Sequence, residues 1–357
     1  MWLFIVLSQV LALSTSVILW WFVQPKTLAK RVILVFSIFL LSNMALFYGL
    51  SDFWRERFRL YLMFSILQGF LIYTFIIICA VGVVYCHVLK RVALPRLTRL
   101  LAIVVYISIV GLAIFNAYSP VVHHLMLTTD KPLKQPMRLV LVSDTHLGKW
   151  FGNRQLDKLA TLVAAQKPDV VVIAGDIMDD YTDYYEQTNM HSHFSKLSAP
   201  LGVYAVLGNH DYRGQDDAIA TAVSQAGMTV LDNEAILLED TLWLVGRSDD
   251  VDHTRLSAKT LLTQVDTNKP VVFLEHRPSA IDEISKLPID VHLSGHTHGG
   301  QIFPLTVLMD WFTPLNHGNK HIGNTQFVVS SGYGFGSVPF RLGTRSEIWV
   351  LTLKSAK

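Results

Sequence analysis

Cysteine is almost absent from this chain of 357 residues, and charged residues are scarce in its first third. The only two cysteines, Cys79 and Cys86, lie inside an apolar run, where a small and weakly polar thiol is readily accommodated. A disulfide framework and a cysteine-based metal site are therefore both excluded. The lack of cysteine in the second half leaves the cellular compartment open, because it is common both inside and outside cells.

Acidic residues are especially rare before Met137, where three Asp or Glu stand against twelve Lys or Arg. The remainder of the chain has twenty-five against eighteen, so the overall charge of +2 combines a basic, apolar first part with a second part near −7. An acidic domain has no broad surface for a phosphate backbone, which argues against general nucleic-acid binding. The uneven charge predicts two regions that meet near residue 137.

Four stretches of the first region contain no Asp, Glu, Lys or Arg and are long enough to cross a bilayer, which takes roughly 20 apolar residues. They predict transmembrane helices over residues 1–24, 32–50, 60–88 and 100–122, followed by a linker over 123–136. The first stretch ends in Trp20, Trp21 and Phe22 where a signal peptide would have small residues, so it is interpreted as an anchor. The uncharged helices argue against a transporter with an intramembrane relay.

The basic residues of the loops indicate the orientation, because they are retained on the cytoplasmic side. Seven lie in the first and third loops: Lys26, Lys30, Arg31, Lys90, Arg91, Arg96 and Arg99. Six lie in the second loop and after the fourth helix: Arg55, Arg57, Arg59, Lys131, Lys134 and Arg138. Asp52 and Glu56 dilute the second loop further. This small difference favours a second region outside the cytoplasm.

Residues 137–357 alternate short β-rich runs with helical stretches, which is typical of βαβ units around central sheets. Strands are predicted over 138–143, 170–174, 203–207, 271–274 and 291–294, with a helix over 154–166. Later runs over 236–245, 326–330 and 348–353 predict further strands with hairpin connections. The predicted fold is an α/β domain, built as an α-β-β-α sandwich.

Side chains that can bind metal ions follow each of the first five predicted strands. In chain order they are Asp144 and His146, Asp176 and Asp179, Asn209 with His210 and Asp211, His276, and His296 with His298. A lone histidine is more often a core residue, and a Gly-Asp pair is often only a turn. Because ligands collect at the carboxyl edge of α/β sheets, five such clusters favour a single cleft.

Carboxylate, imidazole and amide oxygen are the ligands that borderline divalent metals accept, and one carboxylate can bridge two of them. Two cations about 3.5–4 Å apart can share a hydroxide, direct it at phosphorus and neutralise the charge that develops. Manganese, iron, zinc and magnesium are all compatible with these ligands, although the nitrogen donors argue against a pure magnesium site.

The ordered set D-x-H, G-D-x-x-D, G-N-H-D, H and G-H-x-H resembles the calcineurin-like metallophosphoesterase family. The resemblance implies that one metal is held by Asp144, His146 and His298, the other by Asn209, His276 and His296, with Asp176 as the bridge. It also implies that Asn209 and His210 face the substrate, that Asp211 orients the His210 ring, and that Asp179 supports the ligands from behind.

The strings over 295–301, 331–336 and 339–343 resemble a bacterial subgroup, which includes enzymes that cleave the pyrophosphate of UDP-2,3-diacylglucosamine. This implies a bacterial inner membrane as the location. Glu275 and Arg277 depart from the pattern, because small or apolar residues more usually flank the histidine of the fourth motif, and they are expected to alter the charge of the pocket.

Residues 302–312, directly after Gln301, are unusually apolar for a loop beside a metal site. Two interpretations stay open: the loop dips into the bilayer interface and presents a lipid phosphate, or it packs on the domain core or the helices.

The sequence thus predicts a membrane-anchored phosphoesterase with two metal ions, acting on a phosphomonoester, phosphodiester or pyrophosphate, with a lipid-linked substrate favoured. Membrane lipids are the expected surroundings, and no protein partner is inferred. The alternative is a catalytically silent membrane sensor or scaffold that keeps the metal site, which the complete set of ligands disfavours.

Overall fold

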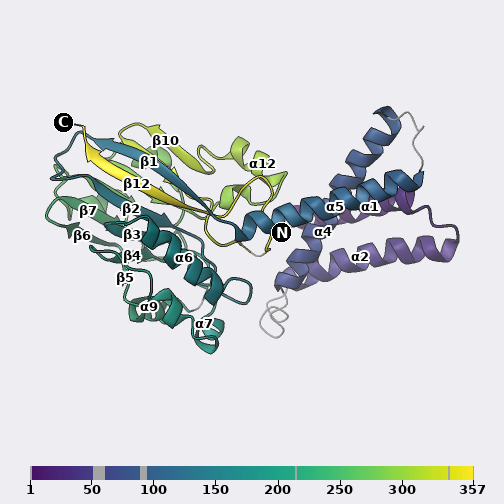
Figure 1. Cartoon of the computed structure of the whole chain (residues 1–357), viewed down its shortest axis with the longest axis horizontal. Helices are drawn as coiled ribbons and strands as arrows, with labels where there is room; N and C mark the ends of the chain where they lie inside the picture. Colours follow the sequence, from purple (N-terminus) through teal and green to yellow (C-terminus); the bar gives the residue numbers. More distant parts are fainter. Residues whose placement is uncertain (1, 51–60, 89–94, 214, 337, 357) are drawn as a thin grey trace. The chain divides into compact units, whose positions relative to one another are not determined.

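The computed structural model describes residues 2–50, 61–88, 95–213, 215–336 and 338–356 (Figure 1). The chain divides into two compact units. The first comprises Met1–Ala113 with Ser337–Pro339, and the second comprises Ile114–Gly336 with Phe340–Lys357.

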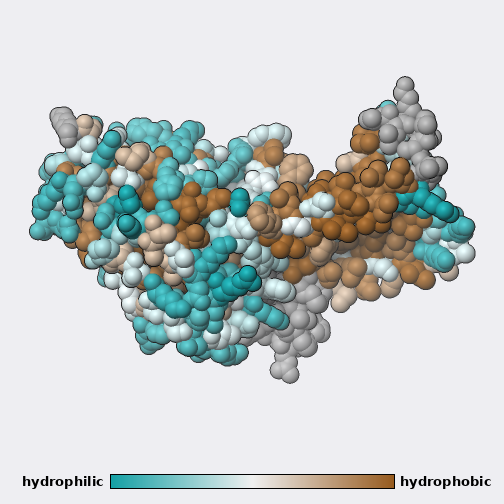
Figure 2. All heavy atoms as spheres, viewed as in Figure 1, coloured by the Kyte–Doolittle hydropathy of each residue, from teal (hydrophilic) through white to brown (hydrophobic). Residues whose placement is uncertain are grey.

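Long apolar helices make up the first unit. They are α1 (Trp2–Val23), α2 (Leu28–Leu50), α4 (Tyr61–Val83), which continues as a π-helical turn (Val84–Val88), and α5 (Pro95–Tyr118), whose last residues belong to the second unit. The amide of Gln9 in α1 donates to Asn43 of α2 over 2.9 Å. Figure 2 shows a surface on this unit that is mainly hydrophobic, unlike the largely hydrophilic surface of the second unit.

Two helical segments are long and apolar enough to cross a membrane, Gly69–His87 and Arg96–Tyr118, and Ser8–Val23 is a shorter apolar stretch. The prediction of four membrane-crossing helices is therefore met by two within the described part of the chain. The second loop, with Arg55, Arg57 and Arg59, lies outside the described residues, as do Lys90 and Arg91. The predicted orientation stays a prediction.

Two six-stranded sheets form the second unit. The first has the order β1-β12-β2-β3-β4-β5 and the second the order β10-β11-β9-β8-β7-β6. In the first sheet the strands are β1 (Val121–Thr129), β2 (Met137–Val142), β3 (Val170–Ala174), β4 (Val203–Val206), β5 (Thr229–Val230) and β12 (Glu347–Ser355). In the second they are β6 (Glu234–Leu238), β7 (Leu242–Gly246), β8 (Val271–Leu274), β9 (Val291–Ser294), β10 (Gly318–Ile322) and β11 (Thr325–Val329).

Short helices complete the predicted sandwich. They are α6 (Asn153–Ala165), α7 (Asp183–Gln187), α8 (His191–Phe194), α9 (Asp216–Gln225), α10 (Ala258–Leu262), α11 (Ile281–Ile284) and α12 (Leu305–Phe312). Side chains alternate along β2. Leu141 lies in the core between the two sheets, and Val140 lies in the core between the first sheet and helices α6 and α9. The predicted α-β-β-α arrangement is thus observed in this unit, with β2 to β5 parallel and β7, β8, β9 and β11 parallel.

Two segments differ from the sequence-based expectation. The run over 236–245 is a hairpin of β6 and β7, which turns at Glu239 and Asp240. The first half of the expected linker over 123–136 is strand, because β1 pairs with β12 along its whole length and so satisfies its backbone groups in the sheet. No hydrophobic alternation signals this strand, since His123 and His124 interrupt it.

Candidate metal centre

The metal-capable side chains predicted at five strand ends come together in the second unit. β2, β3 and β4 run parallel in one sheet, and β8 and β9 run parallel in the other, so that their carboxyl ends deliver residues to one place. Three overlapping groups there have ligand atoms within 4.8 Å of one another: Asp144, His146 and His298; Asp176, His276 and His296; and His146, Asp179 and His210.

The first group presents its nitrogen and oxygen atoms to a common point. His298 Nε2 lies 3.6 Å from Asp144 Oδ1 and 3.3 Å from His146 Nε2. All three residues have little or no solvent exposure, with Asp144 fully buried. Two imidazole nitrogens and one carboxylate facing one another is the arrangement that a divalent cation would complete.

The second group has the same character. His276 Nε2 lies 3.2 Å from Asp176 Oδ2, 3.1 Å from His296 Nδ1 and 3.3 Å from Asn209 Oδ1. The other ring nitrogen of His276, Nδ1, is 2.8 Å from the Ala174 carbonyl, which only accepts, so Nδ1 carries the hydrogen. That bond fixes the ring with the lone pair of Nε2 directed at the group.

Asp176 lies between the two groups. Its Oδ2 is 3.2 Å from His276 Nε2 and 3.6 Å from His146 Nε2, while its Oδ1 accepts the His210 backbone N–H over 2.8 Å. A carboxylate in this position can bridge two cations, as the sequence motifs imply.

In the protein alone, the histidines of the centre divide into neutral rings and a charged one. Burial lowers the pKa of His146 and of His296 to about 3, so both rings are neutral and free to bind a cation. Burial also opposes the charge on His276, yet Asp176 and Asp144 raise its pKa to about 10. A proton on His276 thereby stands where cations would sit, and the residues present fit such cations.

Backbone geometry holds the ligands in place. The φ angles of Asp144, His146, Asp176, His296 and His298 are 52°, 43°, 49°, 72° and 49°, all in the left-handed region that only a few per cent of non-glycine residues adopt. Two glycines make room beside them: a Cβ at Gly208 would lie 2.3 Å from Asp176 Oδ1, and one at Gly295 would lie 2.3 Å from Asp144 Oδ2. The carboxylates therefore rest directly against the backbone of neighbouring turns.

These features agree with the comparison to known proteins, in which residues 137–300 match the calcineurin-like phosphoesterase family. An uncharacterized metallophosphoesterase from Campylobacter jejuni is 32% identical over 271 residues, covering 72% of this chain and 72% of that one. The chain belongs to the calcineurin-like metallophosphoesterase family.

Other relatives of this metallophosphoesterase come from distant organisms. An uncharacterized metallophosphoesterase from Aquifex aeolicus is 32% identical over 239 residues, covering 64% of this chain and 88% of the relative. A zebrafish protein described as a transmembrane protein with metallophosphoesterase domain is 32% identical over 237 residues, covering 62% of this chain and 54% of its own length.

His210 lies at the edge of the metal centre, and its ring meets that of His146 edge-on with centroids 4.8 Å apart. Its Nδ1 is 2.6 Å from Asp180 Oδ1. Burial lowers the pKa of His210, but the hydrogen bond to Asp180 and the charges of Asp176 and Asp180 outweigh it, so the net shift is upward. Asp180 thus shifts the ring towards its protonated form.

Asp211 does not orient this ring, in contrast to the role that the family resemblance implied. Its buried carboxylate accepts the backbone N–H groups of Ile177, Met178 and Gly208 at 2.9–3.1 Å and so clamps two ligand-bearing turns together. Asp180, whose backbone has a φ of 69°, takes the orienting position. Asp179 Oδ1 instead lies 3.8 Å from His146 Nδ1, behind the ring.

Glu275 and Arg277 separate into different environments. The Glu275 carboxylate is 1% exposed and accepts hydrogen bonds from Arg247, Arg255 and His292. These partners neutralise it, so it adds no free negative charge to the pocket, contrary to expectation. Arg277 is partly exposed, and its Nε lies 3.1 Å from Asp249.

Arg341 is a site residue that the sequence reasoning passed over, although it lies within the 339–343 string. Its guanidinium is fully buried and donates to the carbonyls of Ser331, Gly332 and Gly334. It also lies 3.3 Å from His298 Nδ1, the ring nitrogen opposite the one that faces Asp144. Arg341 therefore shapes the loop around the metal centre and positions one of its ligands.

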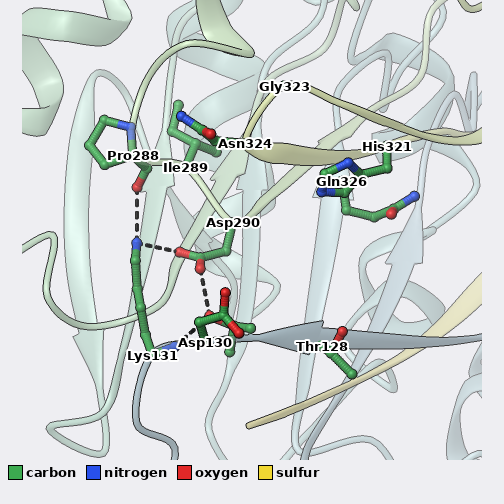
Figure 3. Close-up of a pocket in the computed structure, with 11 residues that line it drawn as sticks. Thr128, Asp130, Lys131, Pro288, Ile289, Asp290, His321, Gly323, Asn324 and Gln326 are labelled. Atoms are coloured by element: carbon green, nitrogen blue, oxygen red, sulfur yellow. Dashed lines mark hydrogen bonds and ion pairs between the residues drawn. The ribbon is translucent and has the colours of Figure 1, made fainter. Parts of the chain in front are cut away.

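A pocket of about 500 Å³ lies at the other end of the domain (Figure 3). Asp290 in its wall directly precedes β9, whereas the ligand His296 follows the same strand. The Asp290 carboxylate accepts from Thr129 and from Lys131, each over 2.6 Å. A phosphate ester would meet a carboxylate and an already paired lysine there, so the metal centre is the better site.

Proposed function

We propose that this metallophosphoesterase is a membrane-anchored hydrolase that cleaves phosphate esters with two divalent cations. The observation that carries the proposal is the position of Asp176 between two groups of buried ligands. When bound, the cations would supply an activated water and neutralise charge on the phosphoryl group. Manganese, iron, zinc and magnesium are the metals to be tested.

The residues of the chain have distinct tasks in this proposal. Asp144, His146 and His298 would hold one cation, and Asn209, His276 and His296 the other. Protonated His210, held by Asp180, is placed to donate a proton to the leaving oxygen. Arg277, next in sequence to the ligand His276, is paired with Asp249 through Nε, and its charge acts on the ligand His296, so the rest of its guanidinium could bind a further anionic oxygen at the metal centre.

We further propose a lipid-linked phosphomonoester, phosphodiester or pyrophosphate as the substrate class, with the site on the extracytoplasmic side of a bacterial inner membrane. Two apolar helical segments of membrane-crossing length support the anchoring. The printed name of the zebrafish relative also supports it. The resemblance of the 295–301 and 339–343 strings to pyrophosphate-cleaving enzymes supports the substrate class.

The test is hydrolysis of an aryl phosphodiester by the full chain in detergent, with each divalent metal added in turn. Asp176→Asn and His210→Ala are expected to abolish or strongly reduce turnover, whereas Asp217→Asn, an exposed acid on α9, is expected to leave it unchanged. Equal activity in all variants would reveal contamination. Tight metal binding without turnover under any metal would overturn the enzymatic function and favour the silent sensor.

A further inference from the structure

Helix α12 and Phe303 before it expose apolar side chains that no packing within their own unit covers. Trp311 and Phe312 are 74% and 79% exposed, and Leu305 is 52% exposed. Phe303, Val307 and Leu308 are exposed as well. Of the interpretations left open for residues 302–312, packing on the core of their own unit is therefore excluded for these side chains.

The helix is amphipathic in the inverted sense. Thr306, the one buried residue of α12, packs against Gly343, and Asp310 accepts a hydrogen bond from buried Asn316 over 3.3 Å. The polar side of α12 therefore contacts the domain. Leu305, Leu308 and Phe312 share a stripe at helical spacing on the other side. A surface helix of a water-soluble domain packs its apolar side on the core and exposes its polar side. The reverse arrangement of α12 therefore suits apolar surroundings.

α12 is also fixed next to the metal centre. It begins seven residues after the ligand His298. Between them, the Gln301 side chain makes two hydrogen bonds with the backbone of Gly336, of 3.0 and 3.1 Å, and the Phe303 N–H donates to Leu342 over 2.7 Å. The base of α12 is therefore tied to the segment that carries the ligand His298.

The end of α5 belongs to the same unit and is held by the same segment. The Asn116 side chain donates to the Arg341 carbonyl over 3.2 Å, and the Ser346 N–H donates to the Asn116 carbonyl over 3.0 Å. Leu342, between these two contacts, pairs with the backbone of Gln301 and Phe303 at the base of α12. Residues 341–346 thus join α12 to the last turn of a helix whose apolar span ends at Tyr118.

We propose that α12 lies in the interfacial layer of the bilayer that α5 crosses, so that the metal centre receives phosphate esters from lipid headgroups in that layer. The substrate part of this statement rests on the proposed function. If α5 spans the bilayer, the membrane surface lies near Tyr118. Trp favours this depth, and Phe and Leu are typical of the apolar face of an interfacial helix. The occupant of the α12 surface is therefore lipid, and not a soluble protein.

Depth measurement tests the location without relying on catalysis. The full chain with Cys79→Ser, Cys86→Ser and Trp311→Cys would carry an environment-sensitive fluorophore, in nanodiscs of phosphatidylethanolamine and phosphatidylglycerol. We expect the emission of the fluorophore to shift to the blue in nanodiscs. We also expect its fluorescence to be quenched when a lipid with a nitroxide near the headgroup is included. The matched control, Gln225→Cys on the exposed part of α9, should show neither change. A blue shift without nitroxide quenching would place α12 against protein and overturn the proposal.

Activity provides the second arm. Trp311→Ser with Phe312→Ser is expected to lower turnover of a nanodisc-borne phospholipid-like ester by at least about tenfold, because the loss of one interfacial aromatic contact alone is of this order and the variant removes two. Turnover of a soluble aryl phosphodiester should stay at the parent level. If the variant turned over both substrates at the parent level, lipid presentation would be overturned. Nitroxide quenching in a protein without any turnover would contradict only the enzymatic proposal.

Discussion

Replacing Asp180 by Asn is expected to slow the hydrolysis of esters with poor leaving groups far more than of esters with good ones. Asp180 Oδ1 makes a 2.6 Å hydrogen bond to His210 Nδ1 and supports the raised pKa of that ring. A hydrogen bond to a charged group is worth about 1.5–3 kcal/mol, which corresponds to roughly a 10- to 100-fold loss of rate where proton donation limits turnover. Arg213, the other partner of Asp180, is half exposed and contributes little.

The assay is kcat for a series of aryl phosphodiesters whose phenols differ in acidity. A good leaving group needs no proton, so the plot of log kcat against the pKa of the phenol should become steeper in the Asp180→Asn variant. Metal content, measured by mass spectrometry on the same samples, should equal that of the parent.

Asp211→Asn is the matched control, because it changes a neighbouring carboxylate that holds three backbone N–H groups and does not touch the ring. It is expected to cost about 2–4 kcal/mol of folding free energy while leaving the leaving-group slope unchanged. A steeper slope for Asp211→Asn and an unchanged slope for Asp180→Asn would refute the assignment and restore the role that the family resemblance implied.

Three further perturbations have defined outcomes. Chelation of divalent cations should lower Tm in scanning fluorimetry, since cations at a hundredfold excess over Kd stabilise the folded state by about 2.7 kcal/mol. An unchanged Tm would mean that the folded protein binds no cations at these ligands. Glu275→Gln should reduce the urea unfolding free energy by about 3–5 kcal/mol, because it leaves the buried Arg247 guanidinium without its counter-charge and removes one of the two carboxylates paired with Arg255. A change below the error of the fit would contradict the buried network. His123 is paired with Glu347 over 3.2 Å, and its pKa is raised because the hydrogen bond to Glu347 outweighs burial. The pair therefore stabilises the folded state fully below about pH 6.5, and this stabilisation is lost as pH rises through the folded pKa. Because this ring is 42% exposed, His123→Gln should cost less than about 1 kcal/mol at acidic pH and nothing at alkaline pH, and the reverse order of Tm differences would contradict the pairing.

The sequence was sufficient for the main lines of the fold and for which residues meet at the centre. Strands β3 and β8 are short, fully buried apolar runs, which have a strong signature, and the residues that follow them are placed by the direction of the strands alone. Strand β1 was missed because its stability comes from pairing with β12, more than 200 residues away in sequence.

The exact contacts within the centre were beyond the sequence for a different reason. Asp179 and Asp180 are adjacent and chemically identical, and only the turn geometry decides which one reaches His210. Arg341 was passed over because a single arginine in a glycine-rich segment carries no signal of burial. Its importance depends on carbonyl groups that the folded loop aims at it.

The left-handed backbone at five ligand positions has a consequence for how this protein tolerates change. Conformations of this kind cost of order 1–3 kcal/mol each, and the rest of the fold must hold them against relaxation. Glycine would relieve the cost at Asp144, His146 or His298, and would remove a ligand at the same stroke. Selection for thermal stability alone would therefore remove metal ligands first. A library screened only for stability should accumulate glycine at these positions, whereas a library screened for turnover should keep aspartate and histidine.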